Sequence, residues 1–455
     1  MRNDSERGVR FEAIGKKSIE VVFDGERRSS DGGATLLAAI DRRLGLTARL
    51  AAMLVDSRAE SRIEHSYLTM FRQRVFAIAL GYADQNDSAR IGTDPVLKLV
   101  CGPTVTDDGA LASQPTLSRF EHAPEGRELV ALSRTLEDQV LSSLSRRHRR
   151  ARQITIDLDG SEDPTHGQQP FSFFNGYYES WCYLPLFGFI SVDGESEQHL
   201  FHARLRPGTV KEVRCSLALL RRIVPELKRR FRRARILIRL DAGFAHPRLF
   251  ELLDELDVDY LVAVGSNPVL DGLAESRMRA SRVLAERFGM SVQLFGEGQY
   301  RAKTWPNARR VIFKAEVVCL GERTPRDNAR FVVTNLRRSP ERLWQLYRAR
   351  GDVENRIKEL HHGLEIDRTS CTSFLANQFR VLETAAAFVL LQALRGEPRN
   401  TELARAQVTT LRERLFKIGA TVKESCRRIV LSLPRSYPWI DVWRRAALAV
   451  GATPS

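Results

Sequence analysis

Residues 153–264 carry the pattern that most restricts the fold of this chain, because strand-like and helix-like segments follow one another there in a distinctive order. Three strand-like segments come first, followed by a helix, a strand, a second helix and a last strand. The segments are, in order, QITIDLD, WCYLPLFGFISV, HLFHARL, TVKEVRCSLALLRRIVPELKRRFRR, RILIRLD, HPRLFELLDEL and VDYLVAVG. This order predicts an α/β fold with a mixed sheet flanked by helices.

The flanking sequence predicts the rest of the domain organisation. Residues 1–150 and 401–455 are expected to be mostly helical. Residues 288–337 form a separate group of strand-like segments, namely SVQLFGEGQYRAK, RRVIFKAEVVCL and ARFVVTNL. The mixed-sheet core is therefore predicted in two parts, residues 151–287 and 338–400, and its second part opens with a long helix over 339 to about 362.

The charge balance is unusual, although the other totals are not. The chain has 455 residues, of which 43% are hydrophobic and 28% charged, as in ordinary globular proteins, but its formal net charge is +15. An excess of Lys and Arg indicates a polyanionic partner, with DNA or RNA first and an acidic membrane second. The alternative is a solvated basic surface that binds nothing.

Cysteine usage and the N-terminus bear on the compartment. The six cysteines are scattered singly without a C-x-x-C pair, which fits reduced thiols in the cytosol better than a zinc ribbon or a redox motif. MRNDSERGVR lacks the apolar core of a signal peptide, and the run from Ala385 to Leu391 is too short to cross a bilayer. We therefore expect a soluble cytoplasmic protein with no membrane partner.

Two carboxylates share one face of the first predicted strand. In QITIDLD, alternate side chains point the same way, so Asp157 and Asp159 project together with Thr155. Two carboxylates side by side repel unless a cation or a bound water separates them. The alternative is a solvent-facing strand edge.

Asp241 ends the strand RILIRLD directly before Ala242 and Gly243. An acid at the carboxyl end of a buried strand beside a Gly turn is a common place for chemistry in α/β sheets. An Asp that only caps the following turn is equally common.

A third acid lies on the predicted helix YRARGDVENRIKELHHG. Helical periodicity places one apolar stripe on this helix and a polar stripe beside it, which contains Glu354. The apolar stripe is Leu343, Leu346, Val353, Ile357, Leu360 and Leu364, and the polar stripe is Tyr347, Arg350, Glu354, Lys358 and His361. The alternative is a helix with ordinary pairs between Arg, Glu and Lys one turn apart.

Together the three acids predict a metal site. Oxygen ligands from separate elements suit Mg²⁺ or Mn²⁺, and two such ions can activate a water and stabilise the leaving oxygen of a phosphodiester. Asp159, Asp241 and Glu354 could bind the metal while the surrounding Lys and Arg hold phosphates, which is the combination that a DNA-cutting enzyme requires.

Several motifs, taken in this order, resemble the DDE transposases of bacterial insertion sequences. The resemblance is strongest to the insertion-sequence 1380 family, which is related to the insertion-sequence 4 group. The motifs are DLDGSEDPTHGQQ, FFNGYYESWCYLPLFGF, LDAGF, YRARGDVENRIKE and DRTSCTSFLANQFR, and the likeness runs from about residue 20 to about residue 400. The resemblance implies a ribonuclease-H-like core with a β-rich insertion. It also implies that Asp159, Asp241 and Glu354 bind two divalent metal ions.

The resemblance leaves two positions open. The family's first acid usually has Ser or Thr two residues later, as Asp159 has Ser161, while Asp157 on the same face remains the alternate. The related Tyr-x2-Arg-x3-Glu-x6-Lys signature matches Tyr347, Arg350 and Glu354. Its terminal Lys position is occupied by His361, and Lys358 lies one turn earlier, so either could contact the phosphate.

Similar transposases carry a β-rich insertion that helps to hold the DNA end, and in relatives that form hairpins a Trp there stacks on a flipped base. In this chain Trp305 stands among cations that include Arg309 and Arg310, and an aromatic residue among cations suits unpaired bases. The alternative is a Trp packed in the insertion's own small core.

Two further segments could contact DNA. In SQPTLSRFE, Ser113 could cap a helix that displays Arg119 near its start, which suits a recognition helix as well as an ordinary surface helix. The basic run SRRHRRAR, up to Arg152, could contact phosphates or merely connect two regions.

The resulting hypothesis is a cut-and-paste transposase. It would bind the terminal inverted repeats of its own element as a homodimer, cleave the ends with Mg²⁺ or Mn²⁺, and join the 3′-OH ends to target DNA in the nucleoid. The alternatives are a silent or domesticated copy that acts as a DNA-binding repressor, and a general metal-dependent nuclease.

Overall fold

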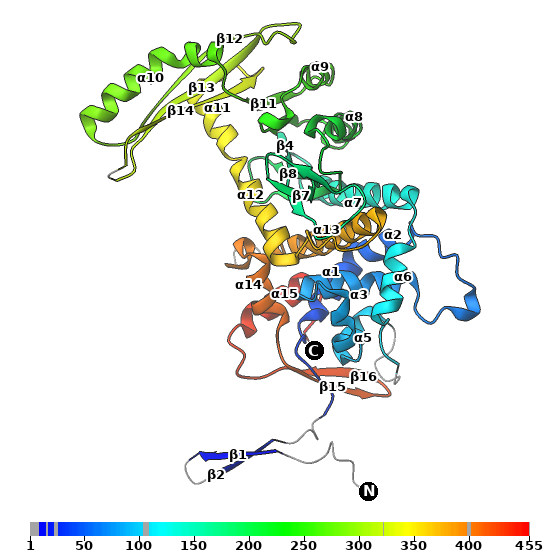
Figure 1. Cartoon of the computed structure of the whole chain (residues 1–455). Coiled ribbons are helices and arrows are strands. Elements are labelled where there is room, and N and C mark those ends of the chain that lie inside the picture. Colours follow the sequence, from blue (N-terminus) through cyan, green and yellow to red (C-terminus); the bar gives the residue numbers. More distant parts are fainter. Residues whose placement is uncertain are drawn as a thin grey trace. The chain divides into compact units, whose positions relative to one another are not determined.

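The computed structural model describes residues 9–14, 17–21, 26–102, 109–321, 323–397 and 402–454 (Figure 1). Residues 1–8, which belong to the segment used to judge a signal peptide, lie outside the described residues. The chain forms two compact units. One comprises Met1–Ala123 with Ala386–Ser455, and the other comprises Pro124–Ala385.

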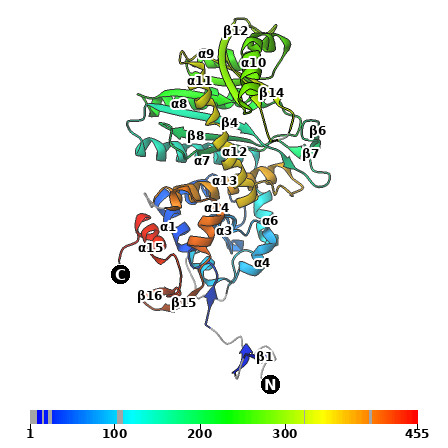
Figure 2. The same cartoon turned by 90° about the vertical axis from the view of Figure 1, so that its left-hand side faces the viewer.

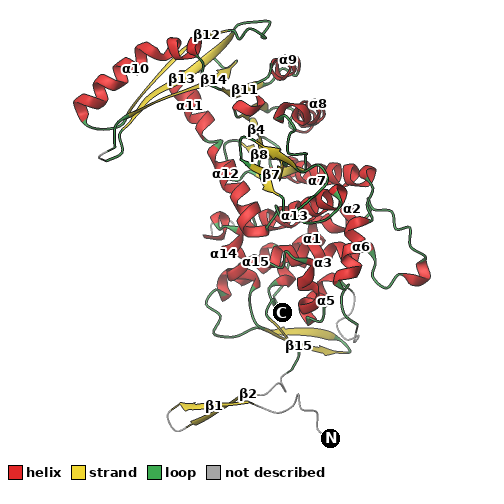
Figure 3. Ribbon diagram, in the orientation of Figure 1, coloured by secondary structure: helices red, strands yellow, loops and turns green. Residues whose placement is uncertain are grey.

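The second unit is built on one sheet of eight strands in the order β12-β13-β14-β11-β10-β4-β8-β9 (Figure 3). Its strands are β4 (Gln153–Gly160), β8 (Leu186–Val192), β9 (His199–Arg204), β10 (Arg235–Leu240), β11 (Asp259–Val264), β12 (Val292–Tyr300), β13 (Arg309–Val318) and β14 (Arg326–Thr334). A small sheet, β5-β7-β6, holds β5 (Asp163–Pro164), β6 (Phe173–Asn175) and β7 (Ser180–Tyr183).

The five strands predicted between residues 153 and 264 form the middle and one edge of this sheet. Strand β4 pairs in parallel with β10, and β10 pairs in parallel with β11. On the other side, β4, β8 and β9 pair antiparallel. The predicted mixed sheet is thus confirmed. Because β4 has a strand on each side, its acids do not lie on a solvent-facing edge.

The strands of residues 288–337 do not stand apart from this sheet. Strand β14 pairs antiparallel with β11, and β13 and β12 extend the sheet beyond it. The strands themselves match the predicted segments, but they continue the central sheet instead of forming a sheet of their own, because β14 supplies the backbone hydrogen bonds that β11 would otherwise lack.

Helices cover both faces of the sheet. They are α7 (Gly126–Arg147), α8 (Glu212–Arg230), α9 (Pro247–Glu255), α10 (Pro268–Phe288), α11 (Pro340–Arg348), α12 (Gly351–Lys358) and α13 (Phe374–Arg395). Helix α11 packs Leu343 and Trp344 on one face, against Ile312 of β13. Helix α10 lies along β12–β14 (Figure 2) and packs on Ala315 and its neighbours, which alternate with Ile312 and so belong to the other face.

The long helix predicted over 339 to about 362 occurs as α11, α12 and a π-helical turn at Glu359–Gly363. Its predicted apolar stripe is confirmed. Leu343, Val353, Ile357, Leu360 and Leu364 are all buried, and Leu346 packs beside them.

The first unit is mainly helical, as predicted for the N-terminal region. Its helices are α1 (Ala34–Leu44), α2 (Leu46–Ala51), α3 (Tyr67–Leu80), α4 (Ser88–Ile91), α5 (Pro95–Cys101), α6 (Gln114–His122), α14 (Val408–Leu411) and α15 (Ile440–Ala449). Short 3₁₀ turns occur at Glu60–Arg62, Gln85–Asp87 and Glu402–Arg405, and a π-helical turn at Arg412–Phe416.

The first unit also contains strands. They are β1 (Val9–Ile14), β2 (Lys17–Val21), β3 (Arg28–Ser29), β15 (Ala420–Ser425) and β16 (Arg428–Ser432). Strands β15 and β16 lie in the C-terminal region that was expected to be helical, and β15 also pairs with β3 from the other end of the chain. Pairing with so distant a segment is not visible in local sequence periodicity.

One helix in the described part of the chain, Phe374–Arg395, is long and apolar enough to cross a membrane by length and composition alone. Inside the protein, however, 83% of its most apolar window is buried. This burial is typical of a core helix.

Candidate active site

The sheet brings Asp159 and Asp241 together from two neighbouring strands. Strands β4 and β10 are parallel, and Asp157 on β4 lies opposite Arg239 on β10. Asp159 and Asp241 each come two residues later along the chain, so they share one face at one level of the sheet. Asp241 follows the last residue of β10, and its Oδ1 accepts a hydrogen bond from the Gly243 N–H at 2.8 Å.

A guanidinium bridges these two carboxylates. Arg350 Nη2 lies 2.8 Å from Asp159 Oδ1 and 3.3 Å from Asp241 Oδ2. Arg350 is only 8% exposed, and its Nε has no hydrogen-bond partner among the described residues. The buried cation therefore stands between two acids that would otherwise repel each other.

The acidity of Asp159 is altered by its surroundings. Burial is the largest cause and raises the pKa of Asp159 to about 7, with Arg350 opposing the rise and Asp241 and Glu354 adding to it. The contribution of Glu354 shows that this residue lies within electrostatic range of Asp159. Glu354 itself is exposed on α12, one turn after Arg350.

Asp157 has a different environment from Asp159, although the two share a face. It is fully buried, and Arg239 grips it with two hydrogen bonds, from Nε at 2.8 Å and from Nη2 at 2.7 Å. Arg239 also donates to the Leu346 carbonyl at 2.8 Å, which ties the strand to α11. The Asp157 carboxylate is thus occupied by a structural ion pair.

His361 is held between two side chains. Its Nε2 lies 2.9 Å from Ser161 Oγ, and its Nδ1 lies 2.9 Å from Asp367 Oδ2. Ser161 follows Asp159 by two residues, so this chain of contacts links the end of β4 to the segment after α12. Burial alone would raise the pKa of Asp367, but the hydrogen bond and charge of His361 outweigh it and lower that pKa.

A second contact of the same kind lies beside it. Thr369 Oγ1 reaches both carboxylate oxygens of the buried Asp163, at 2.9 and 3.0 Å. Gln169 Nε2 donates to the Thr369 carbonyl at 2.8 Å. Residues 367–369 were quoted above as part of DRTSCTSFLANQFR, but their roles were not predicted, because spacing does not show that residues 161–169 meet residues 361–369.

The other residues of the polar stripe are less engaged. Tyr347 is half-buried against Trp344, with ring centroids 5.9 Å apart, and burial raises its pKa. Lys358 is exposed near the end of α12, and no ion pair with it is found among the described residues. The structure therefore brings Arg350 to Asp159 and Asp241, and His361 to Ser161 and Asp367, while Lys358 stays exposed.

The residues of the strand insertion that were predicted to contact DNA bind other side chains of the protein. Trp305 is 8% exposed and packs between Phe250 and Tyr300, at centroid distances of 4.8 and 5.4 Å. Arg309 binds Asp254 through two hydrogen bonds and donates to the Tyr260 hydroxyl. Trp305 therefore packs in a cluster that joins Tyr300 of the sheet extension to Phe250 of α9, and not in a core made by the insertion alone.

The two other arginines predicted to contact DNA, Arg310 and Arg119, have different partners. Arg310 is paired with Glu297 and donates to the Arg338 carbonyl at 2.8 Å. Arg119 is exposed on α6 in the first unit, where its Nη2 donates to Thr116 Oγ1 at 3.2 Å.

The side chains around Arg350 do not form a ready-made site for a divalent cation. As the side chains stand, no group of three or more His, Cys, Asp or Glu in the described ranges is arranged to hold a metal ion. The reason is that Arg350 lies between Asp159 and Asp241 while Glu354 stays exposed. The oxygen atoms of Asp159, Asp241 and Glu354 are nevertheless the kind of ligand that a hard divalent cation prefers.

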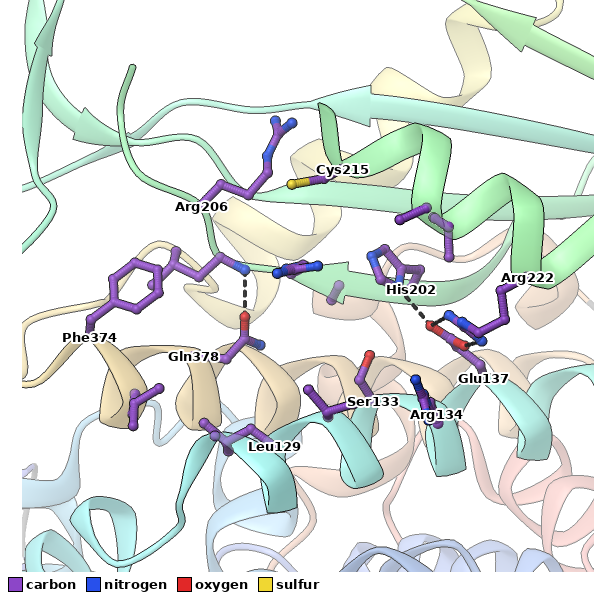
Figure 4. A pocket seen from close by; sticks show the side chains of 18 of the residues that line it. Leu129, Ser133, Arg134, Glu137, His202, Arg206, Cys215, Arg222, Phe374 and Gln378 are labelled. Atoms are coloured by element: carbon purple, nitrogen blue, oxygen red, sulfur yellow. Dashed lines mark hydrogen bonds and ion pairs between the residues drawn. The ribbon is translucent and has the colours of Figure 1, made fainter. Parts of the chain in front are cut away.

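A separate cavity of about 510 Å³ lies between α7, β9, α8 and the start of α13 (Figure 4). Glu137 dominates its polar lining, because it binds His202 Nδ1 at 2.8 Å and also pairs with Arg222. Burial alone would raise the pKa of Glu137, but these two partners outweigh it and lower that pKa. None of the acids near Arg350 lines this cavity.

Comparison with known proteins adds two findings. The family model described as transposase DDE domain group 1 matches residues 11–454. A search of curated proteins found no match.

Proposed function

The chain belongs to the transposase DDE domain group 1 family, and from this premise we propose that it is an active cut-and-paste transposase of an insertion sequence. Proteins of this family act on DNA and generally use divalent metal ions. We assign the chain to the insertion-sequence 1380 group. It would bind the terminal inverted repeats of its element, cut both ends and join them to target DNA.

We assign the strands β9-β8-β4-β10-β11 to a ribonuclease-H-like catalytic core. The observation that carries the proposal is the position of Asp159 and Asp241 on adjacent parallel strands, with Arg350 between them and Glu354 one turn further on α12. These acids come from three elements that are far apart in sequence but converge on one end of the sheet.

Asp159, Asp241 and Glu354 would hold one or two Mg²⁺ or Mn²⁺ ions. Bound there, the ions would supply Lewis-acid stabilisation of the phosphate charge and lower the pKa of the attacking group. Asp159 must lose its proton to serve as a ligand, and Arg350 must leave the two aspartates. Its guanidinium then becomes available for the DNA phosphate, to which it can donate two hydrogen bonds.

The reaction divides into two displacements at phosphorus. In the first, water forms a bond to phosphorus at the element end, and the bond from phosphorus to the 3′ oxygen breaks, which leaves a 3′-OH and a 5′-phosphate. In the second, that 3′ oxygen attacks a target phosphodiester, and the target strand is released with its own 3′-OH. His361 would position the end of β4 through Ser161 while Asp367 fixes the orientation of its ring.

Strand cleavage tests the proposal. Purified protein is incubated with labelled DNA that spans the ends flanking its gene, with Mg²⁺, Mn²⁺ or EDTA, beside the Glu354→Gln variant. We expect metal-dependent cuts at a repeat boundary, followed by joined products, and neither in the variant. Specific binding without cutting would point to a silent copy or a repressor, and cutting without preference for the repeats would point to a general nuclease.

The proposal includes three further properties. Both element ends must meet before joining, so we propose a homodimer on DNA. We also propose a cytoplasmic, nucleoid-associated protein. Arg119 on α6, together with Lys358 and Tyr347 near the acids, would contact the DNA end. Trp305, Arg309 and Arg310 would support the sheet extension from within, given their internal partners.

A further inference from the structure

A cleft of about 610 Å³ is lined almost entirely by arginines. Its lining residues are Arg150, Arg152, Gln153, Arg233, Arg235 and Arg338. All five arginines are exposed. They belong to three basic runs of the sequence. Arg150 and Arg152 lie in SRRHRRAR, which the sequence predicted as a possible phosphate contact, Arg233 and Arg235 lie in a second run, and Arg338 lies in a third.

The sheet topology explains why the three runs meet. Arg150 and Arg152 come directly before β4, and Arg233 and Arg235 stand at the start of β10. These strands are parallel neighbours, and the Arg235 N–H donates to the Arg152 carbonyl at 2.8 Å. Strand β14 is antiparallel to β11, so the chain leaving it brings Arg338 to the same end of the sheet.

Few acids oppose this charge. No ion pair with any of the five arginine side chains is found within the described ranges. Asp259 is one acid near the cleft: burial raises its pKa, and the charges of Arg235 and Arg338 oppose that rise. Asp193 is a second nearby acid, and its Oδ1 accepts hydrogen bonds from the backbone N–H groups of Arg152 and Gln153, each at 2.8 Å, and not from the arginine side chains.

Five guanidinium groups that repel one another, with only Asp259 and Asp193 nearby, are costly to gather in one cleft without a polyanion. Other arginines of the same unit, such as Arg309 with Asp254 and Arg230 with Asp138, do have carboxylate partners. Exposed arginines such as Arg221 and Arg277 also have no carboxylate partner among the described residues, so what sets these five apart is that they line one cleft together. Exposed guanidinium groups in a row suit the regularly spaced phosphates of a nucleic acid backbone.

The cleft also lies away from the candidate active site. Asp159 and Asp241 lie at the carboxyl ends of β4 and β10, and the arginines lie at the amino ends of the same strands. Eight residues of strand separate the two ends by roughly 25 Å at about 3.3 Å per residue. A phosphate in the cleft is therefore not the phosphate being cut.

We propose that the cleft formed by Arg150, Arg152, Arg233, Arg235 and Arg338 binds the backbone of a duplex DNA segment other than the one being cut, without regard to its sequence. The proposal rests on the proposed function in taking DNA as the polyanion. It goes further by assigning a second DNA surface to the opposite end of the catalytic sheet.

The test measures binding of a labelled 30-base-pair duplex of unrelated sequence across a series of salt concentrations. The variant is Arg152→Gln with Arg233→Gln and Arg235→Gln. A matched control removes three exposed arginines of the same unit, Arg221, Arg277 and Arg287. A second variant with Lys at 152, 233 and 235 keeps the charge.

Each lost phosphate contact should lower the slope of log affinity against log salt by about 0.9, so the Gln variant should lose roughly 3 from that slope. The control and the Lys variant should stay near the wild-type slope. Cutting of a short duplex that carries only the element end should be unchanged. An unchanged slope in the Gln variant would overturn the proposal.

Two other probes separate DNA from other polyanions and separate this proposal from the proposed function. If the Gln variant loses affinity for single-stranded RNA or for vesicles of anionic phospholipid but not for the duplex, the assignment to DNA is wrong. If the wild-type protein never cuts but the Gln variant still has a lower salt slope, DNA binding by the cleft is supported and the proposal of an active transposase is overturned.

Discussion

The two ends of the central sheet carry opposite charges, and they differ in whether those charges are paired within the protein. At the carboxyl ends of β4 and β10, Asp159 and Asp241 share Arg350, and Asp157 is paired with Arg239. At the amino ends of the same strands, five exposed arginines line a cleft, and no ion pair with their side chains is found among the described residues. The comparison teaches that one parallel strand pair can place a neutralised acidic centre and an open basic surface at opposite ends.

The difference has a physical meaning. An unpaired charge in a low-dielectric interior is costly. The acids at the carboxyl ends therefore form ion pairs with arginines of the same chain. Exposed charges are solvated and need no internal partner, so they can await an external one. The following predictions test this contrast, beginning with the largest expected effect.

Asp241→Asn should lower strand cleavage by about 10⁴-fold, the scale seen when one member of a catalytic group that acts as a unit is removed. Asp259→Asn, at the opposite end of the sheet, is the matched control and should stay within roughly twofold of wild type. Single-turnover cleavage of labelled element ends measures both. Equal losses in the two variants would mean that the ends of the sheet do not differ in function.

Arg239→Met should lower the free energy of unfolding by about 3–5 kcal/mol, because it leaves the buried Asp157 carboxylate without its cation. The surface pair of Arg279 and Glu275 provides the control, and Arg279→Met should cost less than about 1 kcal/mol. Chemical denaturation gives both values. Adding Asp157→Leu to Arg239→Met should recover much of the loss, and no recovery would argue against a structural pair.

His361→Gln should lower cleavage by roughly 10- to 100-fold, the scale expected for a residue that orients a metal ligand. It removes the link from Asp367 to Ser161 while leaving the acids in place. Binding of the element end should change less than the cleavage rate. If His361 instead contacts the phosphate directly, affinity will fall as much as the rate does.

Stabilisation by Mn²⁺ should increase with pH between about 6 and 8. Burial raises the pKa of Asp159 to about 7, so its neutral form favours folding below that pH, and this contribution is lost as pH rises through 7. A metal ion needs the ionised form, and below pH 7 each pH unit should cost about tenfold in affinity. Thermal melts with and without Mn²⁺ measure the effect, and Asp159→Asn should remove it.

Arg338→Gln alone should give the smallest effect, a loss of about 1 from the salt slope of duplex binding with cleavage of short ends unchanged. Arg342→Gln, a nearby exposed arginine that does not line the cleft, serves as its control. A fluorescence anisotropy titration at several salt concentrations measures both. Equal slopes for the two variants would show that the cleft has no special affinity for the backbone.

Much of the fold was predictable from local sequence. Alternation of apolar residues located the five core strands and the three strands of the insertion, and helical periodicity identified the buried face of α11 and α12. Periodicity succeeds because a strand or helix buries one face almost regardless of its neighbours. It did not show that β14 joins β11, nor that β15 pairs with β3, because strand partners are chosen over long sequence distances.

The sequence by itself placed Asp157 and Asp159 on one face of a strand and Asp241 at the end of another, because alternation is a local property. The β4–β10 register in the tertiary structure brought Asp241 to the level of Asp159. Only the tertiary structure distinguished Asp157 from Asp159, because the two differ in the arginine that reaches each one and not in their spacing. It also decided that Arg350 bridges two acids and that three distant basic runs line one cleft. Electrostatic interactions depend on distances between side chains in space, and those distances are set only when β4, β10 and the helix after them pack together.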